Sequence, residues 1–385
     1  KGWAPGASIQ SSDPEVLKSI KRENLSLDSY KKITVYLNSL EETKSDAEII
    51  LGLPNDTKEK HYNSLRFGID NDVSTMRMFQ AIMLIGTEMA SKEYRNQYEF
   101  KTKYRIMAGT AGSYKIFDQQ HPVAEVEEII IGSNTFNEED YLECRLMNLL
   151  VYTFWNNSTF GEVFEMLKAM DTSCFDCFIY MKSHPEIYSD KINEIIDKFI
   201  IETQELFSSW QEAQDFALPQ ETIAKYMKGE LGTNELIVNR ARLFNEYKDM
   251  VDLMFASVIG TLNEKGIYTS ACDSYLTELK SFISMQKTDC LKDTDKVSTA
   301  FFKYEFDKIQ SENFHVDPNS LSFSDSPIEF SFYHDDEQQE HISNQLSLYS
   351  HHAFPLGKLL DKSDLRMLFR KFRKTTSSDF SEQNK

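Results

Sequence analysis

The stretch AEIILGLPNDT at residues 47–57 decides the fold class that we predict for this chain. Its strand-like first half has no polar alternation after Glu48, which is typical of a strand covered on both faces in a parallel sheet. The strand ends in a turn where Asp56 or Thr57 can cap a following helix. The stretch therefore predicts one strand–turn–helix unit of an α/β protein.

Similar units are expected on both sides of this stretch. A short helix begins where Asp13 can cap its N-terminus and Pro14 suits its first position. Right-handed crossovers between such units build a parallel sheet. Three strands cannot close a barrel and leave an open parallel edge, so we expect further units of the same polypeptide ahead of Lys1. The expected elements are strands at 7–11, 47–53 and 76–84, and helices at about 13–22, at about 27–40 and after Thr57.

The remainder of the chain changes character several times. Helical periodicity dominates its middle part, and short alternating segments return near the end. The expected regions are the sheet unit at 1–94, a mixed connector at 95–136, a helical domain at 137–290, a small α+β region at 291–375 and a disordered tail at 376–385. Strands are expected at about 98–107, 126–132, 300–306 and 328–333, and helices at about 137–170, 187–209, 236–264, 272–287, 335–349 and 357–373.

Composition and charge exclude several classes of protein. The hydrophobic fraction is 41% and the chain carries 27 Phe and 18 Tyr, as expected of a globular protein of two or three folding units. The net charge of −19 repels nucleic acid. No apolar run approaches the roughly 18 residues of a membrane span, and the N-terminus lacks a signal segment, so neither a membrane partner nor export is expected. We expect a cytoplasmic protein with reduced thiols, because its five cysteines are scattered.

Polar residues at the ends of the expected strands are the candidate site. Gln10 lies at the end of the first strand, and Arg22 closes the short helix that can stay at the same rim. Glu48 opens the second strand, where we expect an apolar environment in which a carboxylate needs donors. An amide, a guanidinium and a carboxylate suit an amino acid joined to a ribose. The alternative is a structural ion pair between Arg22 and Glu48, with Gln10 capping a helix.

Four segments of the chain resemble the radical S-adenosylmethionine (SAM) superfamily. They match the fourth, fifth and sixth strand regions of radical SAM barrels in their order and in the Gln-to-Arg spacing. The family commonly has Gly-Glu where this chain has Asn55-Asp56, and a Pro where it has Ile85. The matching segments are 8–11, 17–22, 48–57 and 83–88.

The resemblance implies a fold and a ligand. The chain would be the C-terminal half of a radical SAM (β/α) partial barrel, followed by a mainly helical region and a small α+β C-terminal part. Gln10, Arg22 and Glu48 would contact SAM, and Ile50 and Met83 would lie against its adenine. Segments around 104–105, 112–114 and 125–131 look similar to the extension found in the branch that carries an N-terminal cobalamin-binding domain.

The cysteine motif CxxxCxxC that holds a 4Fe-4S cluster in this superfamily is absent from the sequence. Cys174 and Cys177 form only a CxxC pair, which buried or incidental thiols explain better than a redox or metal pair. His334 and His341 are too far apart along a helix to share one zinc ion, and we expect His351-His352 to lie in a loop without a metal ion. We therefore expect no metal ligands in this chain.

The function that follows is that of a radical SAM enzyme, of which this chain is the C-terminal part. A cluster held by residues outside the chain would cleave SAM to start radical chemistry on a small-molecule substrate, with cobalamin-dependent methyl transfer or carbon-skeleton modification as possible outcomes. The alternative is a non-catalytic module that binds SAM or a partner.

A basic cluster is expected to be a solvated helix face: Arg366, Arg370, Lys371, Arg373 and Lys374.

Overall fold

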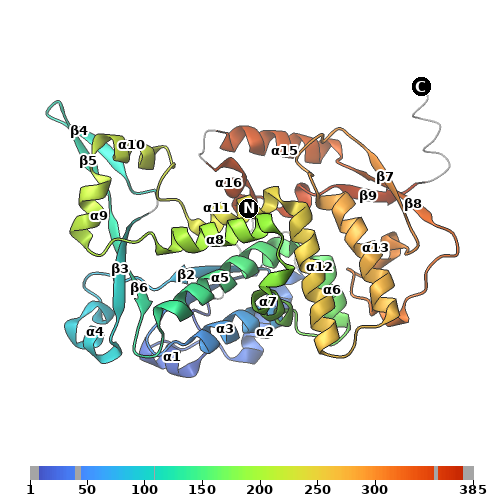
Figure 1. The fold of residues 1–385 in the computed structure, drawn as a ribbon, viewed down its shortest axis with the longest axis horizontal. Helices are drawn as coiled ribbons and strands as arrows, with labels where there is room; N and C mark the ends of the chain where they lie inside the picture. The colour runs from blue at the N-terminus through green and yellow to red at the C-terminus, as the bar shows by residue number, and fades with distance from the viewer. Residues whose placement is uncertain (1–7, 40–44, 108, 351–353, 376–385) are drawn as a thin grey trace. The chain divides into compact units, whose positions relative to one another are not determined.

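A computed structural model describes residues 8–39, 45–107, 109–350 and 354–375. These residues form a mixed α/β protein that is mainly helical, with small sheets and no closed barrel among them (Figure 1). The predicted tail at 376–385 and the pair His351-His352 lie outside the described residues. In the described part of the chain, no helix combines the length and the apolar character needed to cross a bilayer.

The chain divides into two compact units. The first comprises 1–156, 194–240 and 352–354, and the second comprises 157–193, 241–351 and 355–385. The five-region division of the chain that we predict from the sequence remains a prediction. Elements of the first unit are α1 (Pro14–Ser19), α2 (Leu27–Asn38), β1 (Asp46–Leu51), α3 (Lys58–Asp70), β2 (Thr75–Gln80), the 3-10 helix η1 (Glu88–Ala90), α4 (Lys92–Tyr98), β3 (Lys101–Ile106), β4 (Gly112–Ile116), β5 (Gln119–Val123), β6 (Val126–Gly132), α5 (Glu138–Phe154), α9 (Trp210–Ala217) and α10 (Gln220–Met227).

The second unit is built from helices and one three-stranded sheet. Two helices, α8 (Asp190–Gln204) and α11 (Glu235–Asn245), are shared between the units. Elements of the second unit are α6 (Gly161–Ala169), α7 (Phe175–Ser183), η3 (Pro185–Ile187), α12 (Tyr247–Glu264), α13 (Ser270–Lys287), β7 (Ser298–Phe302), α14 (Phe306–Ser311), η4 (Pro318–Ser320), β8 (Ile328–Tyr333), α15 (Asp336–Tyr349), α16 (Pro355–Lys362), η5 (Leu365–Met367) and β9 (Lys371–Lys374). The short helix η2 (Asn156–Ser158) lies at the boundary.

Local sequence signals place the start of the first unit. Asp13 accepts hydrogen bonds from the backbone of Glu15 and Val16, and Pro14 opens α1, as the sequence predicts. Thr57 caps α3 through its hydroxyl, which accepts from the backbone N–H of Lys60 at 3.2 Å. Both caps satisfy N–H groups that a helix start leaves free.

The sheet of the first unit is parallel where the sequence predicts it to be. β1 and β2 pair in parallel, and Gln10 adds a single parallel bridge to Ile49 on the outer side of β1. On the far side, Ile82 makes an antiparallel bridge to Ile129 in β6, which pairs with β3. The predicted strand at 7–11 is thus reduced to one bridge within the described residues.

The prediction that β1 is covered on both faces is wrong. Ala47, Ile49 and Leu51 are buried, whereas Glu48 between them is exposed. Helices α3 and α5 contact β1 and β2 on the buried face. On the other face, Glu48, Arg77 and Phe79 are exposed.

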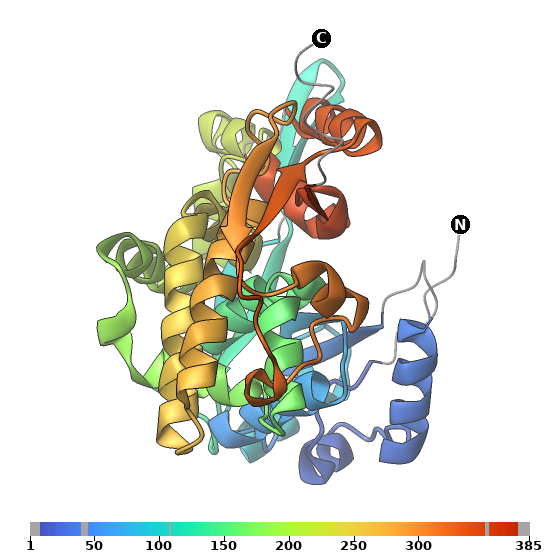
Figure 2. The same cartoon turned by 90° about the vertical axis from the view of Figure 1, so that its right-hand side faces the viewer.

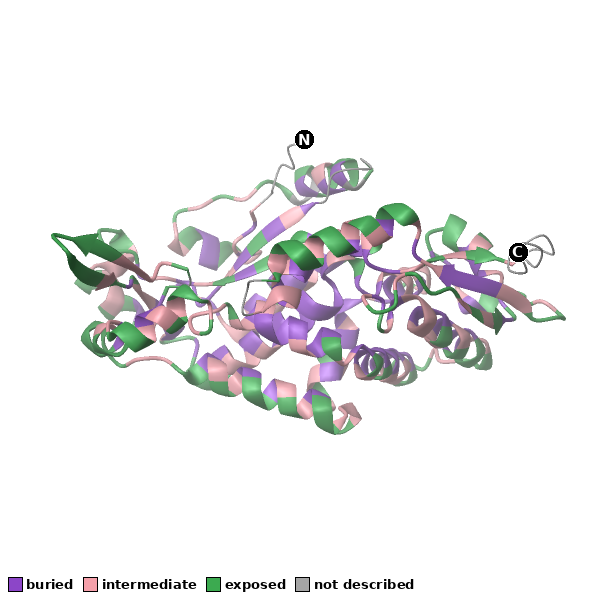
Figure 3. Ribbon diagram, turned by 90° about the horizontal axis from the view of Figure 1, so that it is seen from above, coloured by how far each residue is buried: buried purple, intermediate pink, exposed green. Residues whose placement is uncertain are grey.

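A hairpin formed by β4 and β5 was not predicted. Its strands are almost wholly exposed, and they extend away from the rest of their unit (Figures 1 and 3). Its turn residues Phe117 and Asp118 have left-handed φ values of 47° and 65°. Two-residue hairpin turns of this kind usually carry Asn-Gly, so Phe117-Asp118 is not a recognisable turn signal.

The sheet of the second unit corrects the predicted helix at 357–373. Helix α16 ends at Lys362, and 371–374 is strand β9, which pairs antiparallel with β8 beside α13 (Figure 2). Phe372 packs on Phe282 of α13, with ring centroids 4.7 Å apart. The basic cluster is therefore not one helix face, since part of it belongs to β9. The prediction failed because a short run of alternating Lys, Phe and Arg suits a strand as well as a helix.

Candidate functional site

A hollow of about 470 Å³ opens at the carboxyl ends of the parallel strands. Gln10 and Arg22 both line it, together with Leu53, Glu88 and Tyr94. Ligand sites of parallel α/β proteins lie at this end of the strands, because loops emerge there from a rigid sheet. The structure thus brings together two of the predicted site residues where a ligand would be expected.

Gln10 occupies a strained position. Its φ is 58°, in the left-handed region, and the N–H of Ser11 donates to the carbonyl of Ile9 at 2.7 Å around it. The backbone of Gln10 also forms hydrogen bonds with the two residues that flank Ile49. Its N–H donates to the carbonyl of Glu48 at 2.7 Å, and its carbonyl accepts from the N–H of Ile50 at 2.9 Å. A three-residue turn with a positive central φ is rare, and such strain gathers at functional sites. The Gln10 amide group has no hydrogen bond to a described residue.

Arg22 is anchored by one hydrogen bond and has donors to spare. Its Nη2 donates to the carbonyl of Ser8 at 3.0 Å, and its backbone N–H closes the end of α1 on the carbonyl of Leu17. The side chain forms no other hydrogen bond or ion pair with a described residue. A guanidinium carries five N–H donors, so the remaining ones can bind an anion bidentately.

The rim of the hollow is held by contacts between α1 and the segment after β2. Lys21 forms an ion pair with Glu88 at 2.6 Å, and both side chains are exposed. The hydroxyl of Tyr94 in α4 donates to the carbonyl of Ser19 in α1. These contacts fix the distance between the walls, although an exposed ion pair contributes little stability.

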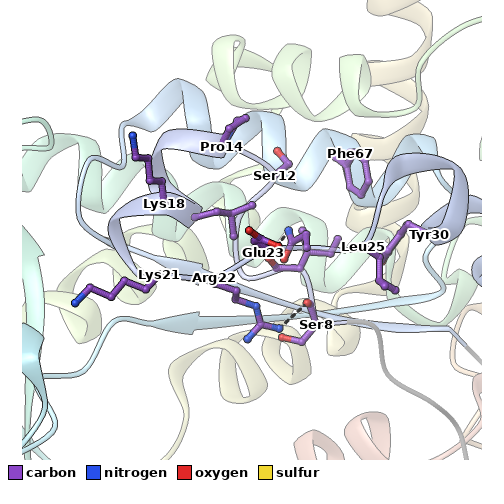
Figure 4. Close-up of a pocket in the computed structure, with 13 residues that line it drawn as sticks. Ser8, Ser12, Pro14, Lys18, Lys21, Arg22, Glu23, Leu25, Tyr30 and Phe67 are labelled. Atoms are coloured by element: carbon purple, nitrogen blue, oxygen red, sulfur yellow. Dashed lines mark hydrogen bonds between the residues drawn. The ribbon is translucent and has the colours of Figure 1, made fainter.

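A second hollow, of about 1120 Å³, lies beside the first and shares Lys21 and Arg22 with it. Figure 4 shows Arg22 directed toward Ser8, whereas Lys18 and Lys21 point away from the middle of the group. Its far wall is aromatic, with the rings of Tyr30 and Phe67 5.3 Å apart. Lys21 and Arg22 are therefore the cations common to both hollows among their described lining residues, and of the two only Lys21 forms an ion pair with a described residue.

Glu48 lies in a different environment from the one predicted. It is exposed, and it forms no hydrogen bond or ion pair with a described residue. The prediction of apolar surroundings for Glu48 was wrong, because it assumed that the strand is covered on both faces. The alternative of an ion pair between Arg22 and Glu48 is also absent from the structure, and Asp13 rather than Gln10 caps α1.

Ile50 and Met83 lie in one hydrophobic cluster. Met83 is buried and Ile50 is half-buried against it, at the carboxyl end of the sheet. The cluster also contains Val16 of α1 and Leu53, which lines the first hollow. The apolar residues predicted to face an adenine are thus continuous with the hollow that contains Gln10 and Arg22.

Comparison with known proteins assigns no family to this geometry. A scan against protein-family models gives no match, and a search of curated proteins finds none that is similar. The resemblance to radical SAM barrels stays a prediction.

Asp56 shapes the loop after β1, a role that the sequence did not reveal. Its carboxylate accepts from the backbone N–H of Gly52 at 3.2 Å and of Thr57 at 3.0 Å. Burial raises the pKa of Asp56 to about 7, although these two hydrogen bonds oppose the shift. Ser19 donates to the carbonyl of Pro54 at 2.9 Å, which ties this loop to α1. The loop and the helix therefore form one wall of the hollow.

All five cysteines are free and buried. The Cys174 thiol lies 3.4 Å from the carbonyl of Phe164, and burial raises the pKa of Cys177 to about 12. Within the described ranges, no three His, Cys, Asp or Glu side chains are grouped so that they could hold a metal ion.

Proposed function

We propose that this chain binds SAM as the C-terminal part of a radical SAM enzyme. The observation that carries the proposal is that Gln10 and Arg22 line one hollow at the carboxyl ends of parallel strands. The two residues are twelve positions apart and come from a strand end and a helix end. The short helix α1 brings them together, as the resemblance implies.

Each predicted group has a chemical task that suits one part of SAM. Arg22 offers unused guanidinium donors to the methionine carboxylate, and the Gln10 amide can donate or accept beside it. The Glu48 carboxylate accepts no hydrogen bond from a described residue, so its lone pairs are available to ribose hydroxyls. Ile50 and Met83 provide the apolar contact that an adenine ring needs.

The sheet supports a partial barrel. Gln10, β1 and β2 run in parallel, with helices on one face and a largely uncovered face opposite. In a β/α barrel the helix-covered face is the outside and the other face is the packed interior. An interior face that lies open is the expected state of a barrel that lacks its other strands.

The described residues do not fit a 4Fe-4S cluster. Three accessible thiolates would be required, whereas the five cysteines are buried and scattered over both units. Cluster ligands, and any cobalamin domain, would have to come from outside this chain. This mismatch favours the second candidate function, a module that binds SAM without cleaving it, for the chain on its own.

Calorimetric titration with SAM and with its stable analogue sinefungin tests the proposal. We expect both to bind the wild-type chain, and Arg22→Ala to weaken binding about tenfold, since a charge-assisted hydrogen bond is lost. Glu48→Gln should weaken it less, because an amide still accepts one hydrogen bond from ribose.

Lys18→Ala provides the matched control. Lys18 is an exposed cation of the same helix that lines the second hollow and not the first. Equal affinities of Arg22→Ala and Lys18→Ala would show that Arg22 does not bind the ligand. A wild-type chain that binds neither compound would refute the proposal.

A further inference from the structure

The hairpin of β4 and β5 extends from its unit with little protein around it (Figures 1 and 3). Helix α10 contacts both strands, yet every residue from 114 to 120 is exposed. A two-stranded hairpin alone in water is marginally stable at best, and a further strand or a packed face is what stabilises it. The hairpin therefore has the form of an arm that a partner completes.

One face of the arm is apolar. Alternate side chains of two paired strands share a face, so Tyr114, Ile116 and Val123 lie together on the hairpin, and all three are exposed. Phe117 in the turn is 97% exposed, although Phe is among the residues that are most often buried. Exposed apolar residues gathered in this way are typical of an interaction surface.

The outer edge of β4 is open to pairing, whereas a proline interrupts that of β5. Ile116 and Gln119 flank the two-residue turn and therefore form a hydrogen-bonded pair. Such pairs alternate with pairs whose backbone groups point outward, so those of Ser113 and Lys115 face the free edge of β4. No described residue outside the hairpin accepts a hydrogen bond from either N–H. On β5, Pro122 is paired with Ser113 and has no N–H to offer.

We propose that β4 pairs antiparallel with β4 of a second copy of the chain, about a two-fold axis at Tyr114. The outward backbone groups of Ser113 then bond those of Lys115 of the second copy, and every contact occurs twice. The two Tyr114 side chains are direct neighbours across the axis, and Ile116 stands opposite Gly112 of the second copy. The result is a four-stranded sheet that completes both arms, and it does not depend on SAM binding.

The sequence of β4 is complementary to itself in this register, which favours a second copy over an unrelated strand. Gly112 has no side chain, so it leaves room for Ile116 opposite it. Lys115 stands opposite the neutral Ser113, so no like charges face each other. Tyr114 and Ile116 of the two copies form one continuous apolar row on the shared face.

The net charge of −19 opposes this pairing only weakly, because the arm itself is neutral. Residues 111–124 contain one Lys and one Asp, Lys115 and Asp118, which form an ion pair at 2.9 Å. The five residues of β4 span about 17 Å, and overlapping antiparallel arms place the acidic remainders of the two chains at opposite ends. That separation exceeds the Debye length of about 8 Å at physiological salt.

Sedimentation velocity of the full chain tests the dimer. Pairing through one strand is smaller than a standard interface, so the dimer should be weak and should appear between about 5 and about 500 μM. Lys115→Pro removes an outward N–H and keeps the bonds within the hairpin, as Pro122 does in β5. It should weaken the dimer at least about tenfold, since two of the hydrogen bonds between the copies are lost. Added NaCl should strengthen the wild-type dimer by screening the acidic remainders.

Gln120→Pro is the matched control, because Gln120 is paired with Lys115 and its outward N–H lies on the edge of β5. This variant and Lys115→Ala, which keeps the N–H, should dimerise like wild type. A wild-type chain that stays monomeric over the whole concentration range would overturn the proposal. So would equal dimerisation of Lys115→Pro and wild type, or equal losses in Lys115→Pro and Gln120→Pro.

Disulfide formation tests the register without a proline. Tyr114→Cys should give a disulfide-linked dimer on mild oxidation, because directly opposite residues of two strands lie within reach of a disulfide. Gln120→Cys should not, and the five native cysteines are buried and should not compete. A dimer in which Tyr114→Cys stays unlinked, or in which Gln120→Cys links equally well, would overturn the pairing through β4.

Discussion

Arg22 donates a hydrogen bond to the carbonyl of Ser8, two residues before Gln10. The contact links the end of α1 to the short segment that pairs with β1. It therefore fixes the two residues predicted to contact SAM, Gln10 and Arg22, relative to each other. The turn around Gln10 is part of the same piece, because its backbone bonds to Glu48 and Ile50 on either side. A rigid, strained strand end is what a preorganised ligand site requires.

The strain at Gln10 predicts an unusual stability order. Gln10→Gly should raise the free energy of unfolding by about 1 kcal/mol relative to Gln10→Ala, because only glycine adopts a left-handed φ without a Cβ penalty. Urea denaturation of both variants measures the difference. Neither variant has the side-chain amide of Gln10, so the difference between them reports only the contribution of backbone strain to the free energy of unfolding. Equal stabilities would show that the turn is unstrained.

Local patterns in the sequence predict much of the fold around this site. Asp13, Pro14 and Thr57 act through neighbouring backbone groups, so a few adjacent residues suffice to place α1 and α3. The strand predicted at 328–333 is β8, and the helix predicted at 335–349 is α15 to within one residue. In each case the signal lies within the element itself.

Long-range features could not be predicted in the same way. Whether Glu48 is buried depends on what covers the second face of β1, and no pattern within β1 reports on that. The role of Phe372 as a strand residue depends on Phe282, ninety positions earlier in the chain. The proximity of Gln10 and Arg22 was predictable, because a short helix at the rim of a sheet leaves few places for its end.

Asp56 should make stability depend on pH near neutrality. Its folded pKa of about 7 lies above the ordinary value of 3.8, so the folded state holds the proton more tightly than the unfolded chain does. Its contribution is therefore fully present below about pH 4 and is lost as the pH rises through 7. Asp56→Asn should flatten the fall in the free energy of unfolding between pH 5 and pH 8, measured by urea titration.

His61 provides a control of opposite sign. Burial lowers its pKa from 6.5 to about 4, and its Nε2 lies 2.7 Å from Oδ1 of Asn148. Its contribution is present above about pH 6.5 and is lost as the pH falls toward 4. His61→Gln should reduce that acid loss without changing the alkaline fall attributed to Asp56. An unchanged fall in Asp56→Asn would mean that another group titrates there.

Gly260 of α12 should not tolerate a side chain. A Cβ there would lie 2.0 Å from Cζ of Tyr180, whose ring stacks on His184 with centroids 3.8 Å apart. We expect Gly260→Ala to lower the free energy of unfolding by about 1–3 kcal/mol, as overpacking does, despite the better helix propensity of alanine.

Gly68 of α3 is the matched control for Gly260. A Cβ there meets Sδ of Met76 at 2.4 Å, and that atom belongs to a flexible side chain that can move. Gly68→Ala should therefore be much less destabilising in the same thermal or urea experiment. Equal losses at both glycines, or no rescue of Gly260→Ala by Tyr180→Ala, would contradict the steric account.

Lys287 should contribute strongly to the second unit because its charge is buried. Only 2% of its side chain is exposed, and its Nζ donates to Glu162 at 2.7 Å and to the carbonyl of Thr159 at 2.9 Å. The ammonium also lies 4.8 Å from the ring centroid of Phe369. Lys287→Met removes the cation and leaves the carboxylate of Glu162, which is 13% exposed, without it.

We expect Lys287→Met to lower the free energy of unfolding by about 3 kcal/mol, the size seen when one partner of a buried ion pair is removed. The double variant Lys287→Met/Glu162→Gln should recover much of that loss, because no uncompensated charge remains. A double-mutant cycle by urea denaturation, completed with Glu162→Gln, measures the coupling. If the single and double variants lose the same amount, the loss comes from packing around Phe369 and not from the unpaired carboxylate.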